Sequence, residues 1–242
     1  MPKLCLDIAA VTRPGGRPEN EDSLWYRSND HTALAMVADG LGGQGDGGRA
    51  SREAVRLLSA GLWGNGTITQ ARIENAVAAA NQGVLALQRQ TGGRMMTTIA
   101  LLAIEGETCH VAHVGDSRLY WFRAGQVFHQ TMDHSAAQMA VLSGDITADE
   151  IRHHPDRSGL LRALGGSPEV RAGYTSGPCG PGDDFLLCSD GFWEHVWETE
   201  MCFDLSKAGN AKEWLSLLLT RVEERLTAAA DNLSAIAVHV DV

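Results

Sequence analysis

The chain has 242 residues, of which 44% are hydrophobic and 21% are charged, and its formal net charge is −10. This size and composition are typical of a globular protein, and we expect one domain over residues 1–242. The acidic balance argues against binding to nucleic acid or to an anionic membrane. Five widely spaced cysteines without a C-x-x-C motif favour reduced thiols. We therefore expect a cytoplasmic monomer that binds neither nucleic acid nor a membrane.

The first half of the chain begins with two predicted strands, around Lys3–Val11 and Ala33–Ala38. A glycine-rich stretch then precedes a predicted helix from about Arg49 to Ala60. A second helix, from about Thr69 to Arg89, carries apolar residues at alternating spacings of four and three, which is typical of an amphipathic helix. These apolar residues are Ile73, Val77, Ala80, Val84 and Leu87.

From Thr97 to Gln130 the apolar residues alternate with a period of two and are separated by turn signals, which predicts an antiparallel meander. A polar stretch from about Asp133 to Pro168 follows. The remaining predicted elements are a strand at Phe185–Cys188, a helix at Ala211–Thr227 and a strand at Leu233–Val240. Blocks of strands with grouped helices indicate an α+β fold in which sheets pack together with helices outside.

Acidic residues recur at the ends of the apolar, strand-like runs. Several carboxylates in one fold repel one another unless a cation neutralises them, and hard divalent cations prefer such oxygen ligands. Histidines and cysteines show no zinc-type spacing, so Mg²⁺ or Mn²⁺ is favoured. The acidic residues in these positions are Glu21, Asp22, Asp39, Asp116, Asp190 and Asp231.

Each of these residues also has an ordinary interpretation, because aspartate closes turns and caps helices. Asp116 is equally well explained as a turn residue paired with Arg118. Gly43, Gly45 and Gly48 form a formal G-x-G-x-x-G, but no second strand ending in an acid follows, which disfavours a dinucleotide site. Arg17 is a candidate for gripping a phosphate near the carboxylates, with Arg13 as its rival.

The ordered motifs together resemble the metal-dependent protein phosphatases of type 2C, and most closely their compact bacterial members. They span Arg17 to Asp231 in the order of that family. The motifs are Arg17-Pro-Glu-Asn-Glu-Asp22, Val37-Ala-Asp-Gly-Leu-Gly-Gly43, Thr97-Thr98, Val114-Gly-Asp-Ser-Arg118, Asp133-His-Ser135, Leu164-Gly165, Ser189-Asp-Gly191 and Asp231-Asn232.

The resemblance implies a β-sandwich of two antiparallel sheets flanked by helix pairs, with a metal centre at one end and a flap at about residues 135–168. It also implies a role for each residue. Asp39 would bridge two Mn²⁺ or Mg²⁺ ions, and the Gly40 carbonyl would ligate one of them. The remaining assignments are Asp190 and Asp231 on the second ion, Glu21 and Asp22 through waters, Asp116 on a third, weaker ion and Arg17 on the phosphate.

The activity implied is hydrolysis of phosphoserine and phosphothreonine in proteins, opposing a bacterial serine/threonine kinase. Two cations bridged by Asp39 would activate a water for attack on phosphorus. Leu41 and Gln44 stand where many members carry a histidine, so metal-bound water would take over protonation of the leaving group. Two alternatives remain: another metal-dependent phosphoesterase, and a catalytically silent phosphoprotein-binding module of the same fold.

Overall fold

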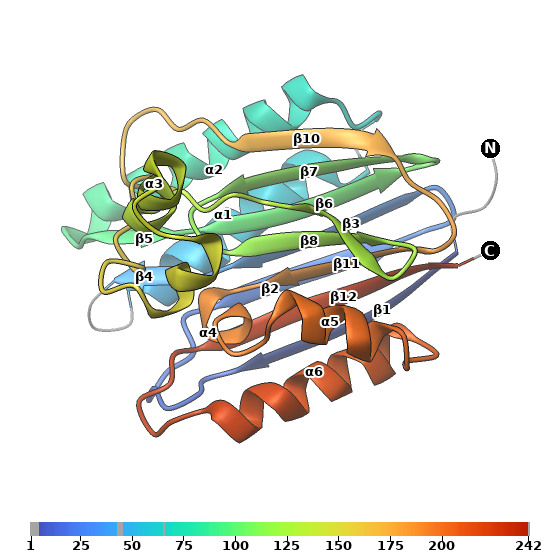
Figure 1. The fold of residues 1–242 in the computed structure, drawn as a ribbon. Coiled ribbons are helices and arrows are strands. Elements are labelled where there is room, and N and C mark those ends of the chain that lie inside the picture. Colours follow the sequence, from blue (N-terminus) through green and yellow to red (C-terminus); the bar gives the residue numbers. More distant parts are fainter. Residues whose placement is uncertain (1–4, 43–45, 65, 242) are drawn as a thin grey trace.

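The structure, a computed structural model, describes residues 5–42, 46–64 and 66–241. Two five-stranded antiparallel sheets pack face to face, with helices on both outer faces (Figure 1). Gly43, Gln44 and Gly45, which carry part of the glycine-rich motif and the departure from the family pattern, lie outside the described residues, as does Lys3.

The first sheet has the strand order β1-β12-β11-β8-β9. Its members are β1 (Cys5–Arg13), β12 (Leu233–Asp241), β11 (Asp183–Cys188), β8 (Arg118–Arg123) and β9 (Gln126–Gln130). The two ends of the chain therefore pair with each other, because β1 lies beside β12 in unbroken antiparallel register.

The second sheet has the order β10-β7-β6-β3-β2. It contains β10 (Gly173–Pro178), β7 (Thr108–Val114), β6 (Ile99–Glu105), β3 (Thr32–Ala38) and β2 (Ser23–Ser28). The short strands β4 (Gly40–Gly42) and β5 (Met95–Thr97) pair separately beside it.

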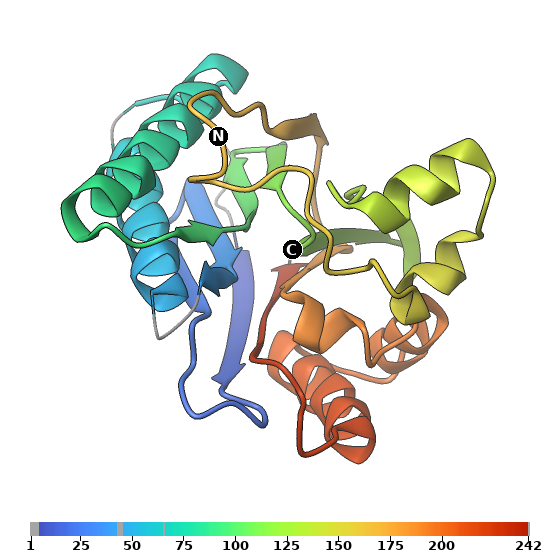
Figure 2. The ribbon, with the colours of Figure 1, turned by 90° about the vertical axis from the view of Figure 1, so that its left-hand side faces the viewer.

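The helices form the two outer layers (Figure 2). Helices α1 (Gly47–Leu62) and α2 (Gln70–Thr91) cover the second sheet. The first sheet is covered by α4 (Asp190–Trp193), α5 (Glu198–Leu205) and α6 (Ala211–Arg225). The predicted β-sandwich with flanking helices is confirmed.

Alternation along β3 shows why the sheets pack in this way. Leu34, Met36 and Ala38 face the helical layer, whereas Ala35 and Val37 face the other sheet. Side chains on a strand point alternately to its two faces, so a strand that is apolar at every position is buried on both sides. The apolar stripe of α2 likewise faces the core.

The strands predicted over Thr97–Gln130 are present, but the prediction that they form one meander is wrong. Strands β6 and β7 form one hairpin in the second sheet, whereas β8 and β9 form another in the first sheet. The chain crosses between the sheets at Gly115, which has a φ of +100°, and a Cβ there would lie 2.6 Å from the Thr98 side chain. Glycine at this position allows both the turn and the close packing.

The segment 135–168 contains α3 (Ala136–Ser143) and the 3₁₀ helix η1 (Ala148–His153). Ala137 and Ile151 are buried against the first sheet and its helices. The chain then crosses the end of the sandwich toward α2 (Figure 2), where the Asn81 amide donates to the Ser167 carbonyl over 2.9 Å. Within the described residues, no helix is both long and apolar enough to cross a membrane.

Candidate functional site

A cavity of about 580 Å³ opens at the end of the sandwich. Asp39 directly follows β3, Asp190 follows β11 after one serine, and Asp231 precedes β12. Strands of both sheets thus bring acids that are far apart in sequence to one place. Of the predicted site residues, the cavity is lined by Arg17, Glu21, Asp39, Gly40, Asp190 and Asp231.

Two threonines hold the backbone of Asp39. The Thr97 hydroxyl donates to the Asp39 carbonyl over 2.7 Å, and the Asp39 N–H donates to the Thr98 hydroxyl over 2.9 Å. The Thr98 N–H also donates to the same carbonyl. These bonds fix the direction of the carboxylate before any ligand binds.

The carboxyl groups of Asp39 and Asp190 lie within hydrogen-bonding reach of each other. Burial and the charge of Asp190 raise the pKa of Asp39 well above its usual range. Burial, followed by the charge of Glu194, raises the pKa of Asp190 to about 6. Two acids this close cannot both ionise easily, so without a cation they tend to share a proton.

Asp22 lies buried behind the cavity and is only half satisfied. Its Oδ2 accepts a hydrogen bond from the Ser189 hydroxyl over 2.8 Å, while its Oδ1 is buried without a partner. Burial raises the pKa of Asp22 to about 7, against the effect of hydrogen bonds from Ser234 and Ser189. A buried acceptor without a donor is rare in folded proteins and indicates a bound water or ion.

The pKa of Asp22 predicts how the stability of the metal-free protein depends on pH. The folded state retains a proton that the unfolded chain releases between about pH 4 and pH 7, so the free energy of unfolding falls as pH rises through this window. Because a tenfold change in proton affinity corresponds to about 1.4 kcal/mol, the loss is on the order of 2–4 kcal/mol. We expect it in urea unfolding with chelator at pH 5 and pH 8.

Asp22→Asn is the matched variant, because asparagine keeps the shape without the titrating proton. Its stability is expected to change less between pH 5 and pH 8 than that of the natural chain. An equal loss in both proteins would contradict the assignment to Asp22.

Arg17 and Asp231 form a forked ion pair at the mouth of the cavity. The Arg17 Nε and Nη2 donate to the two carboxylate oxygens over 3.1 and 2.9 Å. Both side chains remain about half exposed. The rival Arg13 pairs instead with Glu223 on α6, and it does not line the cavity.

Glu21 and Gly40 lie where helix α1 begins. The Glu21 carboxylate accepts the Gly47 N–H over 3.1 Å. A Cβ on Gly40 would lie 2.4 Å from the Gly47 backbone and 2.5 Å from the Glu21 carbonyl. Glycine at position 40 is therefore required by this close approach of the helix.

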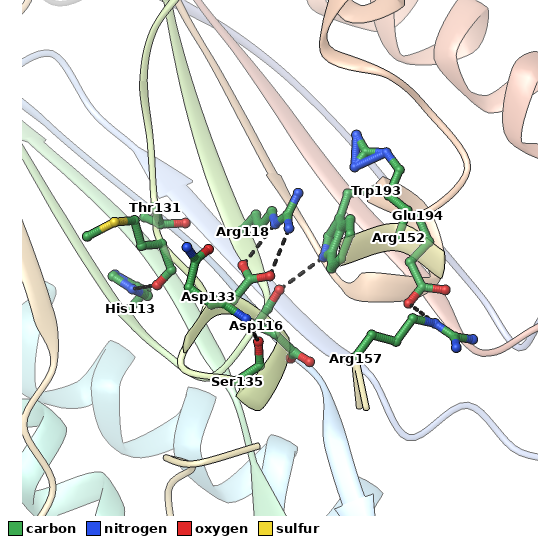
Figure 3. Close-up of polar contacts among 12 residues, drawn as sticks. His113, Asp116, Arg118, Thr131, Asp133, Ser135, Arg152, Arg157, Trp193 and Glu194 are labelled. Atoms are coloured by element: carbon green, nitrogen blue, oxygen red, sulfur yellow. Dashed lines mark hydrogen bonds and ion pairs between the residues drawn. The ribbon is translucent and has the colours of Figure 1, made fainter. Parts of the chain in front are cut away.

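Asp116 lies buried beside a second charged cluster (Figure 3). Arg118 forms a forked ion pair with Asp133, with two bonds of 2.8 Å. The predicted pairing of Asp116 with Arg118 is therefore wrong, although Asp116 does lie in the bend between β7 and β8. Burial and the charge of Asp190 raise the pKa of Asp116 well above its usual range.

Trp193 connects this cluster to the cavity. Its indole N–H donates to the Asp116 carbonyl over 3.0 Å, and the Arg118 guanidinium stacks 3.4 Å from its ring centroid. The tryptophan lies on α4, the helix that begins with Asp190. Through Trp193, the Arg118–Asp133 pair thus packs against one predicted metal-binding residue, Asp116, and against the helix that begins with another, Asp190.

Sequence reasoning missed three residues near the site. Ser158 lines the cavity from the segment 135–168. Arg157 donates over 2.7 Å to Glu194, the residue directly after α4, and so attaches the same segment to the first sheet's helical layer (Figure 3). No motif marks Ser158 or Arg157, and only the position of Glu194 shortly after Asp190 hinted at its proximity.

The residues present fit divalent cations. Asp39 and Asp190 crowd two carboxyl groups together, and Asp22 offers an unpartnered buried oxygen. Within the described residues, no three His, Cys, Asp or Glu side chains already converge tightly enough to hold one ion. Both oxygens of Asp231 accept from Arg17, so this ion pair competes with a metal ion for the Asp231 carboxylate.

Comparisons with known proteins identify the family of this chain. A family model described as protein phosphatase 2C matches residues 16–233. The chain is 30% identical to the serine/threonine phosphatase Stp of Listeria monocytogenes over 235 residues, covering 93% of this chain and 92% of that protein.

Solved structures are similar over nearly the whole chain. The serine/threonine phosphatase PstP of Mycobacterium tuberculosis superimposes with a TM-score of 0.87 at 30% identity, covering 98% of this chain and 99% of that one. A PstP catalytic domain in complex with two manganese ions gives a TM-score of 0.86 at 29% identity, covering 99% and 100%. The chain belongs to the protein phosphatase 2C family of serine/threonine protein phosphatases.

Proposed function

We propose that the chain hydrolyses phosphoserine and phosphothreonine in proteins with the help of two Mn²⁺ or Mg²⁺ ions, and a weaker third ion beside Asp116. The observation that carries this proposal is the contact between the Asp39 and Asp190 carboxyl groups in an open cavity beside Arg17. The similar PstP domain in complex with two manganese ions supports the choice of metal.

In this proposal Asp39 and the Gly40 carbonyl would hold one ion, and Asp39, Asp190 and Asp231 would hold the other. Bound there, the ions would lower the pKa of a water and so supply a nucleophile for the phosphoryl group near neutral pH. Thr97 and Thr98 keep the Asp39 carboxylate in place. Glu21 and Asp22 would accept hydrogen bonds from waters around the ions, and the unpartnered Asp22 Oδ1 supports this role.

Arg17 is proposed to bind the phosphoryl group. Its guanidinium already makes a forked contact with one carboxylate, and the same geometry suits two phosphoryl oxygens. Substrate would thus take Arg17 from Asp231 and free Asp231 for the metal. Binding of phosphate and closure of the metal shell are therefore coupled in this proposal.

Arg17→Ala is expected to raise KM for a phosphothreonine peptide roughly 10-fold or more, because a forked charged contact contributes about 1.5–3 kcal/mol. Arg13→Ala is the matched control, since Arg13 is equally exposed but pairs with Glu223. Steady-state kinetics with saturating Mn²⁺ measure both. An unchanged KM in Arg17→Ala would remove this residue from phosphate binding.

Metal dependence tests the proposal as a whole. The purified chain is expected to hydrolyse 4-nitrophenyl phosphate and a phosphothreonine peptide with Mn²⁺, to lose this activity in EDTA, and to regain it when Mn²⁺ is restored. Turnover that persists in chelator would overturn the mechanism. Full metal binding without any turnover would favour the silent phosphoprotein-binding module.

The cellular setting is proposed from chemistry alone. Substrates are phosphoproteins, and a serine/threonine kinase that phosphorylates them is the natural counterpart of this activity. All five cysteines are free thiols, which suits the reducing cytoplasm. We propose that residues 1–242 act as one monomeric domain, with the segment 135–168 as a flap beside the cavity.

A further inference from the structure

A groove of about 430 Å³ lies on the face next to the cavity, between β7, β9, β10 and α3. Half of the large hydrophobic side chains exposed on the described part of the chain surround it. They are Met132, Met139, Leu142 and Leu161, with exposed fractions of 60%, 53%, 61% and 64%. An exposed apolar group of this kind marks an interaction site.

One end of the groove carries hydrogen-bond donors that face each other. The Gly115 N–H donates to His134 Nδ1 over 3.1 Å. Burial, with the charges of His113 and Arg162 adding to it, lowers the pKa of His134 to about 3, so the ring is neutral. Because Nδ1 accepts from Gly115, the single ring proton is on Nε2. Arg162 Nη1 lies 3.0 Å from this Nε2.

An arginine N–H and an imidazole N–H cannot satisfy each other, because both are donors. Arg162 donates otherwise to the Arg171 carbonyl. Within the described residues, the hydrogen-bond partners of Arg162 are His134 and the Arg171 carbonyl, and neither carries a negative charge. Glu169 lines a neighbouring hollow without pairing with Arg162. An acceptor with negative charge, such as a carboxylate, would satisfy both donors at once.

The groove is also close to the cavity along the chain. Ser158 lines the cavity, and Leu161 and Arg162 line the groove. Three extended residues span about 10 Å, so a peptide with its phosphorylated residue in the cavity reaches the groove within a few residues. On a chain of net charge −10, a positive edge here gives an acidic peptide a specific place to bind.

We propose that this groove docks a segment of the phosphoprotein substrate that carries a large apolar side chain next to an aspartate or glutamate, three to six residues from the phosphorylated residue. The apolar side chain packs among Met139, Leu142 and Leu161, and the carboxylate accepts from Arg162 and His134. This inference rests on the proposed function and extends it to the class of sequence that is preferred.

The test uses pairs of phosphothreonine peptides that differ only in carrying Leu-Glu or Ala-Lys at these distances, on either side of the phosphothreonine. The natural chain is expected to hydrolyse one Leu-Glu peptide with a kcat/KM at least about tenfold higher than its Ala-Lys partner. Leu161→Ser is expected to remove most of this preference, since burial of a leucine accounts for about tenfold or more. Leu217→Ser, on the exposed face of α6, is the matched control and should retain it.

Charge reversal separates docking from a general defect. Arg162→Glu is expected to disfavour the Leu-Glu peptide and to favour an otherwise identical Leu-Lys peptide. Hydrolysis of 4-nitrophenyl phosphate, which is too small to reach the groove, should change less than twofold in Leu161→Ser. Equal kcat/KM for all peptides, or equal losses on peptide and aryl phosphate, would overturn the proposal.

Two other outcomes are distinguishable. If the natural chain hydrolyses neither aryl phosphate nor peptide, the proposed function fails, and fluorescence anisotropy with the unphosphorylated Leu-Glu peptide tests the groove by itself. Binding that Leu161→Ser weakens would support the groove, and no binding would overturn it. If Leu161→Ser changes only self-association in sedimentation, the groove joins copies of this chain and the proposal is wrong.

Discussion

Asp39→Asn is expected to reduce kcat by roughly a thousandfold or more. The carboxylate of Asp39 is proposed to bridge both ions, and a neutral amide offers one neutral acceptor oxygen in place of two charged ones. Transition-state stabilisation by metal ions amounts to several kcal/mol, and each 1.4 kcal/mol corresponds to a factor of about ten. Aryl phosphate hydrolysis at saturating Mn²⁺ measures the loss directly.

Metal binding gives the same substitution a second readout. Calorimetric titration with Mn²⁺ is expected to show weaker binding by Asp39→Asn. Without metal, this variant should be at least as stable as the natural chain, because it removes one of two crowded carboxyl groups. Asp149→Asn makes the same chemical change on the exposed surface of η1 and serves as control. Near-normal turnover by Asp39→Asn would contradict the metal-bridging role and leave Asp39 with only a structural role in the turn after β3.

The largest effect on stability is expected from Asp133→Ala. Arg118 and Asp133 are only 2% and 6% exposed, and removing the aspartate leaves the guanidinium buried without its forked partner. Loss of one member of a buried pair costs about 3–5 kcal/mol. For a chain of this size the melting temperature should fall by roughly 6–20 °C, measured by calorimetry.

Two further variants serve as controls for this prediction. Arg56→Ala removes an exposed ion pair with Glu53 and should cost no more than about 1 kcal/mol. Combining Arg118→Met with Asp133→Leu should recover much of the stability that Asp133→Ala loses, because a buried pair replaced by apolar side chains is often neutral. A drop in Asp133→Ala no larger than that in Arg56→Ala would contradict the role of this pair.

Much of the fold was predictable because local patterns agree with the tertiary structure. The apolar stripe of α2 and the continuous apolar run of β3 are properties of short windows, and both elements are buried in the core. Strands β2 and β10 were missed, since edge strands with few fully buried side chains carry a weak apolar signal. The crossing between the sheets at Gly115 was missed for a different reason. A two-residue period shows that strands exist, but it does not show which sheet they join.

The sequence by itself determined which acids follow apolar strands, and their order pointed to the family. Only the tertiary structure decided which of them meet. Asp39 and Asp190 are 151 positions apart and come into contact because their strands end at the same edge of the sandwich. Arg118 pairs with Asp133 rather than with Asp116, which is nearer in sequence, because the fold brings both Asp133 oxygens within 2.8 Å of the guanidinium. Ion pairing depends on distance in space and on burial, and spacing along the chain records neither.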